Sequence, residues 1–236
     1  MSRVIPLPEF AAGPPQPARV VELVGPAASG KTSLLVEVAG REPEVEAGLR
    51  IPRHRHVAPA LALAPIFLAL HRPYRGLMRK EMKRITYLSA LHRVLQERKA
   101  ARARPVILDE GAVYMLARLL VLGGDRVRGA AFEHWWQSAI QRWAATLDLI
   151  VWLDAPDAVL RERLRARRQS HLVKQSSDEA IDKFMATYRA AYQRVMGALT
   201  EAHGPRVLTV RTDQEPVAHI AQRLLTQLGR SEGGVR

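Results

Sequence analysis

One stretch near the beginning of the chain restricts its possible folds more than any other. Residues 19–25 form an apolar, β-branched run, and residues 31–39 have the spacing of an amphipathic helix. Between them the chain reads GPAASGKT, which fits the pattern Gly-x-x-x-x-Gly-Lys-Thr. In this context of strand, loop and helix, the pattern predicts a phosphate-binding loop, because backbone N–H groups of the loop and helix N-terminus converge on phosphate oxygens.

The residues of this loop have separate expected tasks. Gly25 and Gly30 leave space for the backbone to approach phosphate oxygens closely. Lys31 is expected to reach the β- and γ-phosphates, and the hydroxyl of Thr32 to contact Mg²⁺. The loop residues that we expect to contact the nucleotide are Gly25, Ala28, Ser29, Gly30, Lys31, Thr32 and Ser33.

Strand and helix patterns alternate after the loop. Short apolar runs indicate further strands at 49–52, 105–111, 147–156 and 206–210. Apolar residues at helical spacing lie between and after them, in the segments 77–101, 112–122, 132–147, 157–168, 176–204 and 216–228. This alternation predicts an α/β domain, because parallel strands need helical crossovers that cover both faces of the sheet. We expect a three-layer P-loop NTPase fold with a five-stranded parallel sheet and a helical, arginine-rich lid at about 157–175.

Aromatic residues add one detail to the helix at 132–147. Trp135, Trp136 and Trp143 recur there at helical spacing among other apolar residues. A stripe of this width matches the apolar face of a helix. We therefore expect these side chains in the core, and not as a platform on which bases stack.

The composition is that of a folded protein without disulfides. Of the 236 residues, 47% are hydrophobic, which is enough for a buried core. We expect one domain at 19–228, between a flexible proline-rich arm at 1–18 and a mobile tail at 229–236. The chain contains no cysteine, which excludes disulfides, thiolate metal sites and thiol nucleophiles.

Neither the N-terminal stretch nor the longest apolar stretch has the pattern of a signal peptide or a membrane-spanning helix. Residues 1–20 contain five prolines where a signal peptide would have a continuous apolar core. The longest apolar stretch, 57–70, contains two prolines and is shorter than the about 20 residues of a membrane-spanning helix. We expect a cytoplasmic protein without a membrane span.

The formal net charge of +13 predicts attraction to anions in general, whether nucleotides, phosphorylated metabolites, nucleic acids or anionic membranes. Charge alone does not choose among them. No nucleic-acid-binding motif accompanies the basic residues, so we expect a small-molecule partner and no specific nucleic acid. A homodimer is compatible with the sequence.

Two further segments, read together with the loop, resemble one group of enzymes. The strand at 105–111 ends in Asp109 and Glu110, and the segment LIVWLDAPDAVLRERLRARRQS combines a strand, a helix and several arginines. With GPAASGKT before them, these segments resemble the P-loop small-molecule kinases, in particular the thymidylate kinase and deoxynucleoside kinase branches of the nucleoside monophosphate kinase group. The sequence Asp-Glu-Gly differs from both branches, which usually have Asp-Arg and an aromatic residue or Glu-Arg-Ser. Ala28 stands where many loops of the family have a further glycine.

The resemblance implies a set of catalytic residues. Asp109 would hold Mg²⁺ and Glu110 would act as the base or orient the acceptor hydroxyl, although the two carboxylates could exchange roles. In the lid, Arg163 and Arg167 share one helix face and are preferred for neutralising phosphate charge, since a planar guanidinium engages phosphate oxygens in pairs. By analogy with the family, Asp213 belongs to the turn that borders the adenine.

The acceptor is expected over the carboxyl ends of the strands, near the basic segments 50–56 and 72–84. If the acceptor carries phosphate, the expected contacts are Arg53, Arg55 and Arg75. A solvated basic loop explains these arginines equally well.

Two functions are compatible with these segments. The leading hypothesis is an ATP-dependent kinase that moves the γ-phosphoryl group of a Mg-nucleotide to a small molecule, such as a nucleotide, a nucleoside or a sugar-like hydroxyl. The alternative is a P-loop ATPase switch or motor module, in which Asp109 and Glu110 form a Walker B pair. The arginine-rich segment favours the kinase, because a lid keeps water away from the phosphate.

Overall fold

The computed structural model describes residues 19–49, 51–63, 79–127, 129–167 and 171–229. The predicted arm at 1–18 and all but the first residue of the predicted tail lie outside these ranges. Arg75 also lies outside them, and the side chain of Arg53 is not described.

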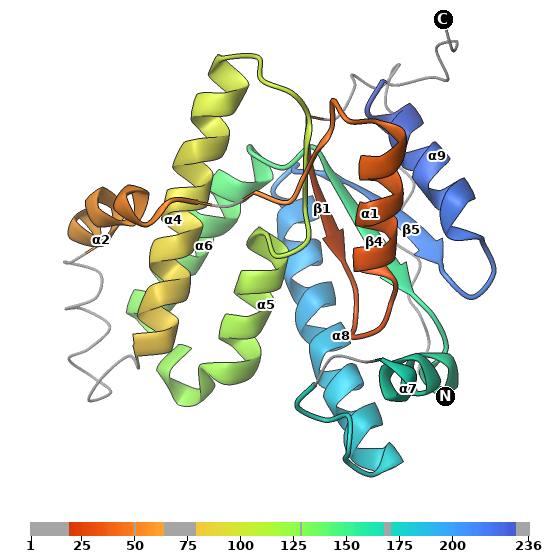
Figure 1. The fold of residues 1–236 in the computed structure, drawn as a ribbon. Coiled ribbons are helices and arrows are strands. Elements are labelled where there is room, and N and C mark those ends of the chain that lie inside the picture. The colour runs from red at the N-terminus through yellow and green to blue at the C-terminus, as the bar shows by residue number, and fades with distance from the viewer. Residues whose placement is uncertain (1–18, 50, 64–78, 128, 168–170, 230–236) are drawn as a thin grey trace, which may run out of the picture.

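Five parallel strands form a sheet at the centre of the molecule (Figure 1). They are β1 Val20–Val24, β2 Glu46–Ala47, β3 Val106–Leu108, β4 Leu149–Asp154 and β5 Arg206–Arg211. Their order is β2-β3-β1-β4-β5, so the strand that leads into the loop lies in the middle. In register, Glu22 of β1 lies beside Leu108 of β3 and Ile150 of β4. The predicted five-stranded parallel sheet is confirmed.

Helices cover both faces of the sheet, as the sequence predicts (Figure 1). The described α-helices are α1 Lys31–Arg41, α2 Val57–Ala62, α4 Arg79–Ala100, α5 Ala112–Leu122, α6 Ala130–Ala144, α7 Asp157–Ala166, α8 Asp178–Glu201 and α9 Val217–Gln227. Short 3-10 helices occupy Arg53–His56 and Gly124–Val127. α1 and α9 pack on one face, around Val21 and Leu23 of β1, and α4, α5, α6 and α8 pack on the other, around Val20 and Val24.

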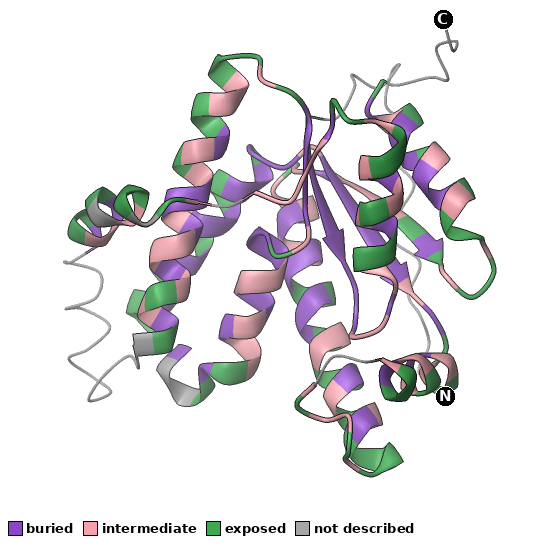
Figure 2. Ribbon diagram, viewed as in Figure 1, coloured by how far each residue is buried: buried purple, intermediate pink, exposed green. Residues whose placement is uncertain are grey.

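Buried residues follow the strands and the sides of the helices that face the sheet, in one apolar cluster on each face (Figure 2). Trp135, Trp136 and Trp143 are buried in one of these clusters, so the prediction that they belong to the core is confirmed. A separate small cluster of apolar residues joins α7 to α8. No helix in the described part of the chain is long and apolar enough to cross a membrane.

Three local boundaries differ from the predictions. The strand predicted at 49–52 is wrong: β2 lies at Glu46–Ala47, because its position follows from pairing with β3, where the Gly48 N–H donates to the Ile107 carbonyl. Helix α1 continues through Gly40 to Arg41, since a glycine on its open side does not interrupt the backbone hydrogen bonds. Helix α8 begins at Asp178 and not at residue 176, because the Ser177 side chain caps it by accepting the Ala180 N–H.

Candidate active site

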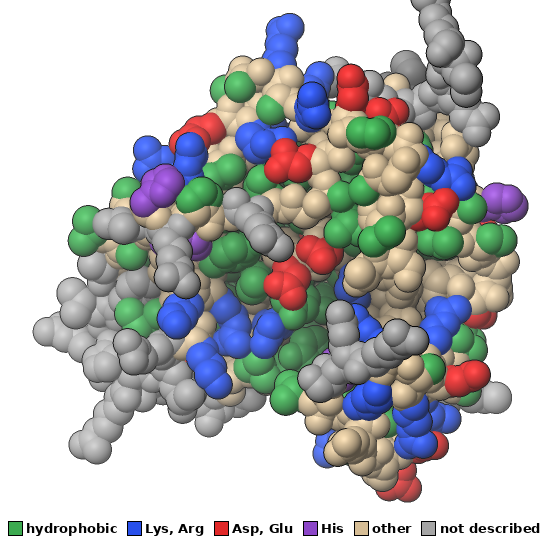
Figure 3. Space-filling model, viewed as in Figure 1, with side chains coloured by type: hydrophobic (Ala, Val, Ile, Leu, Met, Phe, Trp, Pro, Cys, Tyr) green, Lys and Arg blue, Asp and Glu red, His purple; other side chains and the backbone are tan. Residues whose placement is uncertain are grey.

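A cavity of about 870 Å³ opens beyond the carboxyl ends of β1, β3 and β4. Three parts of the chain line it: the loop 25–34, the strand end at Asp109 and Glu110, and the α7 segment at Arg163 and Arg167. Figure 3 shows this face of the molecule hollowed near its centre, with acidic, basic and apolar side chains around the hollow. The structure therefore brings the three predicted segments to one site, at the edge where parallel sheets bind ligands.

The backbone of the loop is held in conformations that restrict its residues. A Cβ atom at Gly25 would lie 2.1 Å from the carbonyl oxygen of Leu153 in β4, so no larger residue fits there. Gly30 at φ +94° and Ala28 at φ +64° adopt left-handed conformations. Glycine adopts such a conformation readily, whereas another L-residue does so at a cost of about 1–2 kcal/mol. Ala28 therefore carries backbone strain that a glycine at this position would not have.

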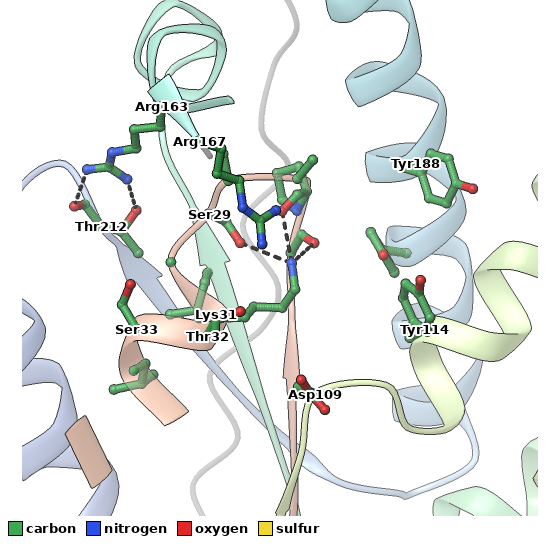
Figure 4. Close-up of a pocket in the computed structure, with 18 of the residues that line it drawn as sticks. Ser29, Lys31, Thr32, Ser33, Asp109, Tyr114, Arg163, Arg167, Tyr188 and Thr212 are labelled. Carbon is green, nitrogen blue, oxygen red and sulfur yellow. Dashed lines mark hydrogen bonds between the residues drawn. The ribbon is translucent and has the colours of Figure 1, made fainter. Parts of the chain in front are cut away.

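The Lys31 ammonium lies against the loop and donates hydrogen bonds to the carbonyl oxygens of Gly25 (2.7 Å) and Pro26 (2.9 Å) (Figure 4). Burial and then the neighbouring Arg167 guanidinium lower the pKa of Lys31 to about 8, and the nearby carboxylates oppose this only in part. Two cations that converge in a partly buried space favour an anion between them. The geometry thus suits a phosphate group next to Lys31.

Side chains with oxygen atoms that could bind a metal ion lie on the side of Lys31 away from Arg167. Figure 4 shows Asp109 and Arg167 on opposite sides of Lys31, and Thr32 lines the same cavity. Carboxylate and hydroxyl oxygens are ligands that Mg²⁺ prefers, and this ion usually completes its shell with water and nucleotide phosphates. Among the described residues, no group of three or more His, Asp or Glu side chains could hold a metal by itself. The donors fit a Mg²⁺ ion that binds together with a nucleotide.

The arginines of the α7 segment point in different directions. Arg163 reaches the turn after β5, where its guanidinium donates to the side-chain hydroxyl and to the carbonyl of Thr212, both at 2.9 Å (Figure 4). Arg167 lies beside Lys31. Arg161 and Arg165 instead pair with acidic residues near the start of α8. The prediction that Arg163 and Arg167 share one helix face is wrong, because α7 ends at Ala166 and Arg167 is extended. Arg167 lies on the phosphate-loop side of the cavity and Arg163 on the side of the β5 turn.

Two of the other predicted contacts do not line this cavity. Arg55 pairs with Glu97 of α4, and Asp213 pairs with Arg211. Thr212, next to Asp213, does line it. The acceptor role of the arginines at 53, 55 and 75 and the nucleotide contact of Asp213 stay predictions.

Sequence reasoning missed an aromatic wall, which consists of Tyr114 of α5 and Tyr188 and Tyr192 of α8. The wall lines the cavity together with Arg118, and Figure 4 shows Tyr114 and Tyr188 across the loop from Arg163 and Thr212. Arg118 donates to the Tyr114 hydroxyl (2.9 Å) and lies over its ring, 5.3 Å from the centroid. The available sequence signal is the spacing of four residues within each helix, which places two polar-tipped side chains on one face.

A buried carboxylate in β1 was also missed. Glu22 is 0% exposed, and it accepts hydrogen bonds from the backbone N–H groups of Val113 (3.0 Å) and Tyr114 (2.9 Å). Burial raises the pKa of Glu22 to about 7, against the lowering effect of these N–H groups. The available signal is a carboxylate in the middle of an apolar strand, where a charged residue needs a partner.

The fold and the loop together define a P-loop nucleotide-binding protein. The family model described as an AAA domain matches residues 20–191, most of the chain, and the chain belongs to this family. A search of curated proteins found no match to the sequence.

Solved structures share the fold at low sequence identity. Deoxyadenosine kinase from M. mycoides with products dCMP and a flexible dCDP bound is 13% identical, with a TM-score of 0.51, over 89% of this chain and 98% of that chain. The same enzyme with bound dATP is 12% identical, with a TM-score of 0.51, over 88% and 99% of the two chains. The predicted resemblance to P-loop kinases is confirmed at the level of the fold.

Proposed function

We propose that this protein is an ATP-dependent phosphotransferase, which moves the γ-phosphoryl group of Mg-ATP to a small-molecule acceptor. The observation that carries the proposal is the composition of one cavity. A phosphate-binding loop, two carboxylates and two arginines from the α7 segment line it, and an aromatic wall lies at its other side. A nucleotide and a second ligand could thus meet over the loop, which an enzyme that transfers a group between two molecules requires.

The nucleotide would extend from Thr212 toward Lys31. The link from Arg163 to the Thr212 turn would hold the base side of the cavity in place. The Lys31 ammonium would exchange its loop carbonyls for β- and γ-phosphate oxygens, and Arg167 would neutralise charge that spreads over the transferred group. Bound Mg²⁺, held by Thr32 and Asp109, would screen the phosphate charge in the same way.

The acceptor would lie between the loop and the aromatic wall. Glu110 lines the cavity there and is the residue that we expect to orient the acceptor hydroxyl or to accept its proton. Burial and the charge of Glu110 raise the pKa of Tyr114, so its phenol stays protonated. Its hydroxyl is therefore available for a hydrogen bond to the acceptor. Rings and a guanidinium on this side suit an acceptor with a flat apolar part and a polar or anionic substituent, as in a nucleoside or nucleotide.

ADP formation from Mg-ATP tests the proposal, measured with a panel of nucleosides, nucleoside monophosphates and sugars and also without an acceptor. We expect at least one acceptor to accelerate ADP formation strongly. Lys31→Ala should abolish transfer, by about 100-fold or more, with the fold intact, whereas the control Lys99→Ala should not, since Lys99 pairs with Asp148 before β4.

Two outcomes would reject the kinase. Rapid ADP formation that no acceptor increases would favour the ATPase alternative, and full transfer activity in Lys31→Ala would contradict the assigned site. Glu110→Gln should slow transfer much more than it weakens ATP binding; equal effects on both would assign Glu110 to nucleotide binding.

A further inference from the structure

Glu22 connects the strand of the phosphate loop to the helix that follows β3. Its two carboxylate oxygens accept hydrogen bonds from consecutive N–H groups, those of Val113 and Tyr114. These are the second and third residues of α5, the positions whose N–H groups a capping side chain normally satisfies. Residue 111, which precedes the helix, is a glycine and offers no capping side chain. A residue 91 positions earlier in the sequence therefore caps α5.

Glu22 also packs closely against Gly111, the residue before α5. A Cβ atom at Gly111 would lie 2.6 Å from Cδ and from Oε2 of Glu22, and the nearest atoms that it would meet all belong to this glutamate. Gly111 has φ −89° and ψ −148°, and the space that a side chain would need there is taken by the Glu22 carboxylate. The Glu22 side chain in β1 therefore occupies the space that the missing side chain of Gly111 leaves before α5.

This contact lies between the two halves of the reaction site. Two residues after Glu22, β1 ends and the loop begins at Gly25. On the other side, the turn that Glu22 holds carries Asp109 and Glu110 into the cavity, and the first turn of α5 carries Tyr114. Glu22 itself does not line the cavity, so its effect on a ligand would pass through these residues.

We infer that Glu22 is a positioning residue: by capping α5 from β1, it sets the carboxylates of the β3–α5 turn and Tyr114 relative to the phosphate loop. The inference rests on the proposed phosphotransfer. A displacement of about 1 Å at reacting groups can cost roughly 100-fold in rate. Loss of the cap should therefore lower kcat with little change in the KM for ATP, since the loop itself stays in place.

Glu22→Gln is the first test, because glutamine has the same shape but one acceptor oxygen fewer. We expect kcat to fall roughly 10- to 100-fold and the KM for ATP to change less than about threefold. Asp148→Ala is the control, because Asp148 also accepts two backbone N–H groups, those of Arg19 and Val20, through one carboxylate oxygen at the opposite end of β1. This variant loses both hydrogen bonds and the ion pair with Lys99 away from the cavity, and it should keep its kcat.

A rescue experiment separates positioning from any other role of the carboxylate. Glu22→Ala removes the cap and also empties the space that a side chain at residue 111 would need. Adding Gly111→Ser to Glu22→Ala places a local capping hydroxyl before the N–H groups of α5. We expect the double variant to recover most of the kcat lost in Glu22→Ala. Hydrogen exchange at the Val113 and Tyr114 amides should become faster in Glu22→Ala and slower again in the double variant.

The outcomes distinguish this inference from the proposed function. If the wild-type protein transfers phosphate and Glu22→Gln has the same kcat, or if the KM for ATP rises as much as kcat falls, Glu22 is not a positioning residue. Failure of the local cap to restore kcat, although amide protection returns, would also overturn the inference. If the wild-type protein itself transfers phosphate to no acceptor, the proposed function fails first and the inference fails with it.

Discussion

The ionisation of Glu22 should make the stability of this protein fall as the pH rises through neutrality. Two effects compete at this side chain: burial disfavours the charged carboxylate, and the N–H groups at the start of α5 favour it. Burial is the larger effect, and it raises the pKa from the usual 4.5 to about 7. Two tyrosines on which the Glu22 charge acts, Tyr87 of α4 and Tyr192 of α8, have raised pKa values and stay neutral in this range.

The sign and size follow from proton linkage. Between pH 4.5 and about 7 the folded protein keeps a proton on Glu22 that the unfolded chain has lost. The stabilisation is therefore complete below pH 4.5, and it is lost as the pH rises through about 7. At about 1.4 kcal/mol for each pKa unit, the loss amounts to roughly 3 kcal/mol. Glutamine at this position does not ionise, so Glu22→Gln should lack this loss.

Urea unfolding of both proteins between pH 4.5 and 8 measures the effect, because titration of all other groups cancels in the difference. We expect the free energy of unfolding of Glu22→Gln, relative to wild type, to increase by roughly 3 kcal/mol across this range. A difference that does not change with pH would refute the raised pKa.

Three further predictions concern the loop and the core. Ala28→Gly should raise the free energy of unfolding by about 0.5–1 kcal/mol in urea, because relief of the left-handed strain exceeds the entropy cost of glycine; a loss of stability would contradict this. Gly25→Ala should abolish ATP binding in isothermal titration, since the new methyl group would meet the Leu153 carbonyl, and unchanged affinity would contradict the assigned loop geometry. Trp143→Ala should lower the free energy of unfolding by about 3–5 kcal/mol, as expected for a large buried side chain, and a loss below about 1 kcal/mol would place it outside the core.

The parts of the fold that the sequence predicts are those encoded by local spacing. The loop at 25–32 has its full pattern within eight residues, and the strand and helix on either side follow from their hydrophobic period. The burial of Trp143 and its neighbours follows from the same period. β2 was misplaced because a strand of two residues has no period of its own, and only its pairing with β3 sets its position.

The sequence by itself determined that this chain folds as a P-loop domain and where its phosphate loop lies. Tertiary structure alone decided that Arg163 turns to Thr212 while Arg167 meets Lys31, and that tyrosines from two helices form one wall. It also decided that Glu22 caps α5. The physical reason is that these contacts join side chains far apart in the chain, and burial and charge act through distance in space, which no local pattern records.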